Sequence, residues 1–446
     1  MNTSKIRRII VIAGIISLFV SYAGLWNRLI SDPIERTGAD FIHIYSAGRI
    51  AKSHGISQVY NLELQQDIEE EQVGFPLAAG QILPFNHLPF LIPILRLVMS
   101  ESYISSFYRW NLIMISLYLL GIGIFSLILK QSGLGWKLTL LSAIGGFLFL
   151  PIFVSLMNGQ DTAIVFLGAA IWVFGLLSGK DTLAGIGLSL TTVRPHIALV
   201  LALPMLFRYR KVFLVFCLGS GALALFSVLI LGVDGTREYI NVLLITAGGE
   251  WYGMHQEAML NLIGMLMRTL PIEADAIRAV GWAAYGIVIV YLCILWSGKK
   301  DLQDGRIGLT VALAIFAVPH LHFHDMALLL VPIYELIRSS NQDGGIKTRI
   351  ATALPIAISL AFLLSNATYL LQYTAPYLIT LGVAGYPYYS KRNWPLQHSI
   401  DHDRYKNKNQ IRTRPFIHAP GNFVAALLPN RPGSIKQRAS KNQRRD

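Results

Sequence analysis

The fold class is decided by stretches such as residues 103–129, YISSFYRWNLIMISLYLLGIGIFSLIL. About 20 apolar residues in an α-helix cross the hydrocarbon core of a bilayer, so this stretch is long enough to span a membrane. Its one charged side chain, Arg109, stands near the start and is expected to extend to the interface. Because helices and closed barrels satisfy their backbone hydrogen bonds in lipid, such stretches predict a helical membrane protein.

Similar stretches recur to about residue 385. The 446 residues are 53% hydrophobic and 14% charged, whereas soluble domains carry about 25% charged residues. We predict spans at residues 9–26, 103–129, 138–157, 163–177, 213–231, 280–296, 307–318, 326–337, 351–364 and 370–384. A further stretch is broken near Arg194 into two half-helices, which form either a re-entrant hairpin or two thin spans. The predicted fold is an all-α polytopic membrane protein with about ten to twelve transmembrane helices.

The basic residues predict which segments face the cytoplasm. Lys5, Arg7 and Arg8 precede the first span, and later basic residues fall between alternate spans, so both termini are placed inside. The first apolar stretch has no small-residue cleavage site, which favours an uncleaved anchor. Residues 27–102 then form a long extracytoplasmic loop, where prolines interrupt the apolar residues 82–98 and predict interfacial helices. We expect a multi-pass protein of the inner or plasma membrane.

The end of the chain differs from the rest. Residues 391–446 carry thirteen Lys and Arg against three Asp, and so hold +10 of the net charge of +13. We predict a membrane domain over residues 1–390 and a disordered, basic cytoplasmic tail over 391–446 that is attracted to anionic membrane lipids. The tail contains no nucleic-acid-binding module, so no nucleic-acid partner is expected. The chain has two cysteines, both in apolar runs, which predicts neither a disulfide framework nor a thiolate metal site.

Asp40 is the first polar residue with a candidate chemical role. It lies shortly after the first span, in the segment TGADFIHIYSAGR of residues 37–49, and is therefore placed near the outer membrane surface. A carboxylate there can take a proton from an acceptor hydroxyl. The alternative is a helix N-cap, because Asp before an apolar helical pattern is a common start signal.

Two further outward-facing motifs are short. In Asn158-Gly159-Gln160-Asp161-Thr162, either a sugar or phosphate approaches the glycine backbone, or Asp161 or Thr162 caps the next helix. Arg194-Pro195-His196 lies between apolar half-helices, and a buried arginine is costly unless it is paired or hydrated. It either contacts an anion at the broken helix or forms an internal salt bridge with a carboxylate such as Asp161.

Histidines and aromatic residues complete the candidate set. His320, His322 and His324 precede Asp325, but their spacing differs from that of known zinc motifs, so we expect hydrogen bonds to a phosphate or sugar and no metal. The loop after Leu231 carries Asp234, Arg237, Glu250, Trp251, Tyr252, His255 and Glu257. Such a mixture suits sugar recognition and equally suits an interfacial aromatic belt.

Taken in order, these motifs resemble glycosyltransferase family 87, the polyprenol-phosphate-mannose-dependent mannosyltransferases of GT-C fold. The resemblance rests on Asp40 through Arg49, Asn158-Gly159-Gln160, Arg194-Pro195-His196 and residues 319–325, and covers about residues 7–385. Two departures are Phe75-Pro76-Leu77, where the family often has Tyr-Pro-Pro, and Arg194, where lysine is frequent.

The resemblance implies transfer of a mannose or another hexose or pentose from a polyprenyl-phosphate donor to a lipid or glycan acceptor of the envelope, outside the membrane and without a cofactor. It implies Asp40 as general base and Arg194, His196, His322 and His324 as contacts of the donor phosphate. Substrate contacts are expected from Tyr45, Arg49, Asn158, Gln160, Glu250, Trp251 and Asp325. The main alternative is a transporter or flippase of a lipid-linked saccharide, which also uses broken helices. A third is a structural protein of the envelope, which would give Arg194 and the histidines no role.

Overall fold

The computed structural model describes residues 3–32, 40–247, 256–298, 302, 305–341 and 345–364. These residues all lie within one compact unit, Met1–Arg392. Every regular element in the described part of the chain is a helix, so the predicted all-α fold is confirmed. The predicted span at 370–384, the tail from 391, Glu250 and Trp251 lie outside the described residues.

Six of the described helices or helix pairs are long and apolar enough to cross a membrane. They are α1 (Thr3–Ser31), α6 (Tyr103–Gln131), α7 (Trp136–Phe147) together with α8 (Leu150–Met157), α13 (Arg210–Ala247), α15 (Ala274–Ser297) and α18 (Ile346–Leu364). Shorter apolar helices include α9 (Thr162–Leu177), α11 (Pro195–Ala202) with α12 (Met205–Arg208), and α16 (Arg306–Ala317). The protein is therefore a multi-pass membrane protein. The predicted span 138–157 is interrupted between α7 and α8, where Pro151 lies in the first turn of α8.

Helices α6 and α9 run side by side in the same direction. Trp110 donates to the carbonyl of Gly159 at 2.6 Å, and the rings of Tyr118 and Phe166 lie 5.6 Å apart. Farther along both helices, Leu129 and Val173 line one small cavity. The basic residues that follow them, Lys130 and Lys180, consequently lie at the same end of the bundle.

The break near Arg194 is the tip of a helical hairpin. Helix α10 (Asp181–Leu190) runs parallel to the first half of α13, because Gly185 packs against Val212 and Val215 while Thr192 hydrogen-bonds Ser220 at 2.7 Å. The chain between them must therefore turn back, and it does so through η4 (Thr191–Val193), α11 and α12. Helix α10 with η4 runs along α9 in the opposite direction, because Gly175 packs against Ala184 and Gly168 against Thr191. Arg194 lies at the tip of the hairpin, at the level where α9 begins, since it contacts Asp161 at the N-cap of α9.

The segment after Leu231 was expected to be a loop, and this expectation is wrong for its first part. Helix α13 continues to Ala247 beyond a kink at Gly232, whose φ of 67° is easily adopted by glycine. The second half of α13 packs on the first polar segment, where the rings of Tyr60 and Tyr239 lie 4.8 Å apart. This tertiary contact stabilises a helix that the polar residues of the segment did not predict.

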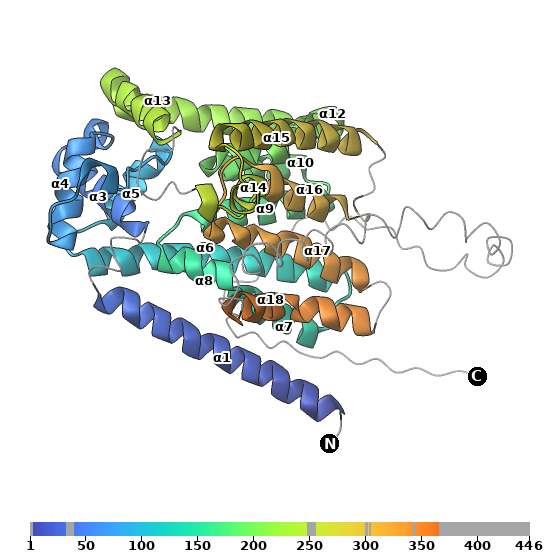
Figure 1. The fold of residues 1–446 in the computed structure, drawn as a ribbon. Coiled ribbons are helices and arrows are strands. Elements are labelled where there is room, and N and C mark those ends of the chain that lie inside the picture. The colour runs from blue at the N-terminus through green and yellow to red at the C-terminus, as the bar shows by residue number, and fades with distance from the viewer. Residues whose placement is uncertain are drawn as a thin grey trace, which may run out of the picture. The chain divides into compact units, whose positions relative to one another are not determined.

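Residues 40–102 form a small helical region at one end of the bundle (Figure 1). It contains α3 (Phe41–Ser53), α4 (Leu62–Val73), η3 (Pro89–Leu91) and α5 (Ile92–Val98). As predicted, residues 82–98 contain no regular span. The extended part is held by side chains of α4: Glu69 accepts from the Leu83 amide at 3.0 Å and Gln65 from the Phe85 amide at 2.7 Å.

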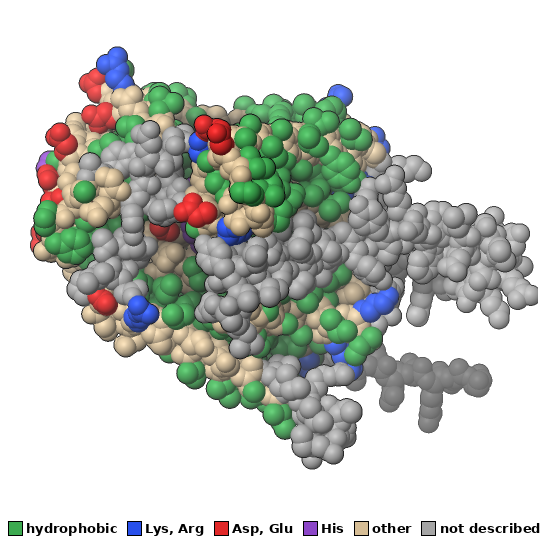
Figure 2. Space-filling model, viewed as in Figure 1, with side chains coloured by type: hydrophobic (Ala, Val, Ile, Leu, Met, Phe, Trp, Pro, Cys, Tyr) green, Lys and Arg blue, Asp and Glu red, His purple; other side chains and the backbone are tan. Residues whose placement is uncertain are grey.

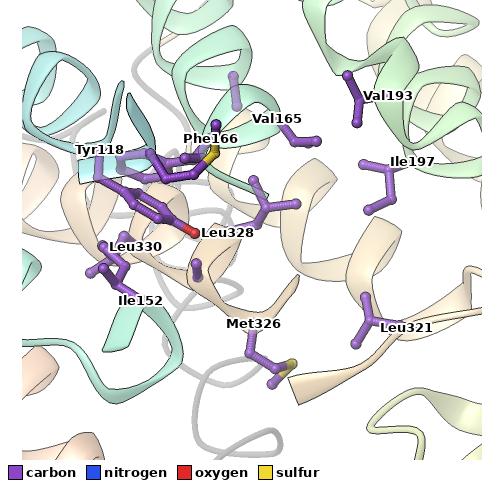
Figure 3. Packing of buried hydrophobic residues seen from close by; sticks show 14 of the residues in the cluster. Tyr118, Ile152, Val165, Phe166, Val193, Ile197, Leu321, Met326, Leu328 and Leu330 are labelled. Carbon is purple, nitrogen blue, oxygen red and sulfur yellow. The ribbon is translucent and has the colours of Figure 1, made fainter. Parts of the chain in front are cut away.

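The surface and the core agree with this arrangement. Figure 2 shows acidic side chains gathered over the α3–α5 region, where α4 exposes Glu63, Asp67 and Glu71, whereas hydrophobic side chains cover α13 and α15. In the interior, buried side chains of α6, α8, α9, α11 and η6 (Phe323–Leu329) pack together (Figure 3). This packing fixes the three polar turns that begin α9, α11 and η6.

Candidate functional site

Asp40 stands at the N-cap position of α3, but its side chain makes no capping hydrogen bond. Instead its Oδ2 accepts a hydrogen bond from Nε2 of Gln160 at 2.6 Å. The side chain of Asp40 is 26% exposed, so it remains accessible from outside the cluster. A partly exposed carboxylate that is held by a neutral amide is suited to accept a proton.

The turn between α8 and α9 brings Gln160 to this carboxylate. Gly159 has a φ of +66°, and a Cβ there would lie 2.6 Å from the Cβ of Phe41. The backbone of the turn therefore approaches the start of α3 more closely than other residues allow. The amide of Gln160 bridges two charged groups, because it donates to Asp40 while its Oε1 accepts from Nη2 of Arg194 at 2.8 Å.

Arg194 joins three segments that are distant in the sequence. Its Nη2 lies 3.0 Å from Oδ1 of Asp161, and its Nε lies 3.4 Å from Oδ1 of Asp325. The salt bridge with Asp161 that the sequence left open is therefore present. Among the described residues, no hydrogen bond or ion pair engages Nη1, and the side chain is 13% exposed. The arginine is held by carboxylates and still has donor capacity for an anion.

Behind Asp161 lies a pair of histidines that sequence reasoning missed. Nδ1 of His87 donates to Oδ2 of Asp161 at 2.6 Å, and the Nε2 atoms of His87 and His43 lie 3.0 Å apart. Both histidines are buried. The available signal was the polar pair Asn86-His87 within the proline-broken apolar stretch 82–98. Its contact with Asp161 orients the carboxylate that in turn holds Arg194.

The histidine run lies on the other side of Asp40. Nδ1 of His324 lies 3.9 Å from Oδ2 of Asp40, and its Nε2 lies 3.5 Å from Oδ2 of Asp325. Asp325 also accepts from the hydroxyl of Thr162 at 3.2 Å. His322 is adjacent, with its ring centroid 5.8 Å from that of His324. His324 therefore contacts the candidate base and the arginine-bound carboxylate together.

His196 and His320 continue this side of the site. Their rings lie 6.2 Å apart, and His320 packs on His322 at 4.7 Å. His196 follows Arg194 by two residues, and its carbonyl accepts from the hydroxyl of Tyr285 at 2.8 Å. A row of imidazoles thus leads from the hairpin tip toward Asp40.

The electrostatic balance separates the acids from the imidazoles. Burial would raise the pKa of Asp161, but Arg194 and His87 outweigh it and hold that pKa well below its ordinary value. Burial is likewise outweighed at Asp325, whose pKa is kept low chiefly by His324 and Arg194. Burial lowers the pKa of His324 and lowers that of His322 to about 4. Asp161 and Asp325 are consequently ionised, whereas burial favours the neutral forms of His322 and His324.

Other predicted site residues are placed differently. Tyr45 donates to the carbonyl of Glu101 at 2.7 Å, and Arg49 donates to the Tyr45 hydroxyl at 2.9 Å, so both hold the start of α6. Asn158 forms the C-cap of α8 beside the site. Within the described residues, no group of His, Cys, Asp and Glu has the geometry of a metal site.

The comparisons identify the family. The model of glycosyltransferase family 87 matches residues 76–319, more than half of the chain. The chain belongs to glycosyltransferase family 87. The predicted family is thereby confirmed, and the protein is a membrane glycosyltransferase. Comparison with curated proteins gives no match. The matched residues contain Gln160, Asp161 and Arg194, whereas Asp40 and His324 lie outside them and reach the site through the fold.

Proposed function

We propose that this family 87 protein transfers a sugar from a polyprenyl-phosphate donor to a hydroxyl of a lipid or glycan acceptor, with Asp40 as general base. The observation that carries this proposal is the Gln160 bridge, which holds the partly exposed Asp40 carboxylate beside the Arg194 guanidinium. A proton acceptor and a cation are thus set next to each other. Transfer from a sugar phosphate requires this combination, because one group activates the hydroxyl and the other stabilises the leaving phosphate.

The proposed reaction is a single displacement. The acceptor oxygen attacks the anomeric carbon and gives its proton to Asp40, while the bond between that carbon and the phosphate oxygen breaks. The electron pair leaves with the polyprenyl phosphate, so the charge lost by the base appears on the leaving group. Attack opposite the leaving group inverts the anomeric centre. Arg194 binds the phosphate, with His196, His322 and His324 around it and with Asn158 and Asp325 near the sugar.

An apolar pocket supports a lipid donor. It has a volume of about 220 Å³ and is lined by Thr192, by Leu88 to Phe90 and by both halves of α13, including Leu231 and Tyr239. Thr192 precedes Arg194 by two residues, so the pocket begins beside the proposed phosphate site. An isoprenoid chain in it would have its phosphate end near the guanidinium, and the exposed apolar side chains of α13 continue toward lipid.

The end of the bundle that carries the site is proposed to face outward. Lys130 and Lys180 lie at the opposite end, and positively charged loops remain in the cytoplasm. The site would then lie on the extracytoplasmic side of the inner or plasma membrane, where a membrane-embedded polyprenyl phosphate delivers sugar without a nucleotide. This orientation places the start of α1 inside, as the sequence predicts.

The deciding experiment supplies radiolabelled polyprenyl-phosphoryl mannose, glucose and arabinose to the purified protein in nanodiscs with total envelope lipid as acceptor. We expect label to move from one donor into a new lipid or glycan product. A nucleotide sugar as the sole active donor would overturn the donor assignment. In sealed proteoliposomes, label that crosses the bilayer on intact donor, with no product, would indicate a flippase instead.

A further inference from the structure

The candidate site carries an excess of negative charge. Among the residues that the structure describes, three carboxylates, those of Asp40, Asp161 and Asp325, face one guanidinium, that of Arg194, which gives a formal charge of −2 when the imidazoles are neutral. Protonation of His87, which donates to Asp161, changes this charge only to −1. The charge is therefore of the same sign as that of a phosphate.

This excess opposes the binding of the proposed donor. A sugar phosphodiester brings one more negative charge to a mostly buried site, and like charges at short range in a low dielectric repel strongly. Arg194 alone is already shared between Asp161 and Asp325. Without an additional positive charge, the phosphate has no net attraction to the site.

A nearby imidazole is the simplest source of that charge. His324 is buried, and its two ring nitrogens face Asp40 at 3.9 Å and Asp325 at 3.5 Å. Asp161, in the turn before α9, also favours the protonated form of His324. Three groups oppose that protonation: Arg194 at the hairpin tip, His43 in α3 and the adjacent His322. The groups around His324 thus include three carboxylates, and the phosphate of a bound donor would add a fourth anion.

We propose that the donor phosphate binds together with a proton, which the imidazole of His324 takes up. This inference rests on the function proposed above. One imidazolium offsets the negative charge that the phosphodiester adds to the site. An anion that binds without a proton is therefore repelled by the net negative charge. The same imidazolium faces the phosphate when the sugar leaves, and the leaving group then gains its second negative charge. Binding and catalysis both require the charge on His324.

The test measures proton uptake directly. Farnesyl methyl phosphate, a phosphodiester whose charge does not titrate near neutral pH, is titrated calorimetrically into the protein in nanodiscs, in buffers of different ionisation enthalpy. We expect uptake of about one proton at pH 7 and a Kd that weakens by about tenfold per pH unit above it, because one linked proton has that effect. His324→Gln should abolish the uptake, weaken binding at pH 6 and make the Kd independent of pH.

His54→Gln is the matched control, because His54 is exposed at the end of α3, outside the cluster. It should retain the wild-type uptake and pH dependence. Binding that shows the same Kd from pH 6 to pH 8 and no buffer dependence would overturn proton-coupled binding while leaving the donor class in place. Wild-type uptake in His324→Gln would overturn the assignment to this residue. Absence of binding at every pH would overturn this inference and the polyprenyl-phosphate donor together.

Discussion

Two buried arginines in this protein have opposite surroundings. Arg338 in α17 (Leu330–Ser340) meets Glu335 through two hydrogen bonds of 2.9 and 2.6 Å and donates to the carbonyl of Leu302 at 2.7 Å. One guanidinium and one carboxylate cancel there. Arg194 instead divides its donors among Gln160, Asp161 and Asp325, in a cluster that keeps excess negative charge.

The difference indicates which buried charge is structural. A bidentate pair engages the donors of the guanidinium fully and leaves little capacity for a ligand, so its role is structural: it orients Arg338 toward the Leu302 carbonyl. An arginine that is shared among several carboxylates leaves a net charge, which is costly to bury. Such a cost is expected where a ligand or a proton binds and neutralises that charge. Arg338 also lies in the last turn of α17, whereas Arg194 lies at the hairpin tip, where α11 begins.

Asp40→Asn tests the cluster most severely. We expect kcat for sugar transfer to fall by about 10²- to 10⁴-fold, because Asn cannot accept the proton of the acceptor hydroxyl. The Tm should change little, since Asn still accepts from Gln160 and the position is partly exposed. Glu335→Gln is the contrasting variant: it should lower the Tm and leave kcat of the folded protein intact. Full transfer activity in Asp40→Asn would remove the residue from catalysis.

Arg194→Ala compared with Arg338→Ala separates binding from stability. Both leave a buried carboxylate without its cation, so both should lower the Tm. Only Arg194→Ala should weaken donor affinity, by about 30-fold, equivalent to about 2 kcal/mol. The measurement is the donor Kd on folded protein in nanodiscs. Equal donor affinity in the two variants would show that the charge imbalance has no part in binding.

Glu69 adds a buried carboxylate that forms no ion pair with any residue in the described part of the chain. Burial raises its pKa to about 8, although the Leu83 amide opposes this. The folded state therefore holds a proton that the unfolded state releases above about pH 4.5, so stability should fall as pH rises from about 5 to 8. We expect a decline of a few degrees in Tm over this range, and Glu69→Gln should lack it. The same decline in Glu69→Gln would assign the effect to other groups.

The sequence predicted well what depends on local composition. The spans of α6, α13, α15 and α16 follow from apolar length, and the break at Thr191–His196 follows from polar residues and a proline inside an apolar stretch. Less predictable were the helix after Gly232 and the role of residues 82–88. Their structure depends on contacts with partners distant in sequence, as in the pairing of Tyr239 with Tyr60.

By itself, the sequence determined that the chain is a multi-pass helical membrane protein, and it singled out Asp40, Gln160, Arg194 and His324 as polar residues that need a reason to be there. Only the tertiary structure decided that they meet. The hydrogen bond between Asp40 and Gln160 joins residues 120 positions apart, and the one between Arg194 and Asp325 joins residues 131 apart. No local sequence pattern predicts such contacts, because Asp40 and Arg194 are paired with side chains from other parts of the bundle and not with neighbours on their own helices.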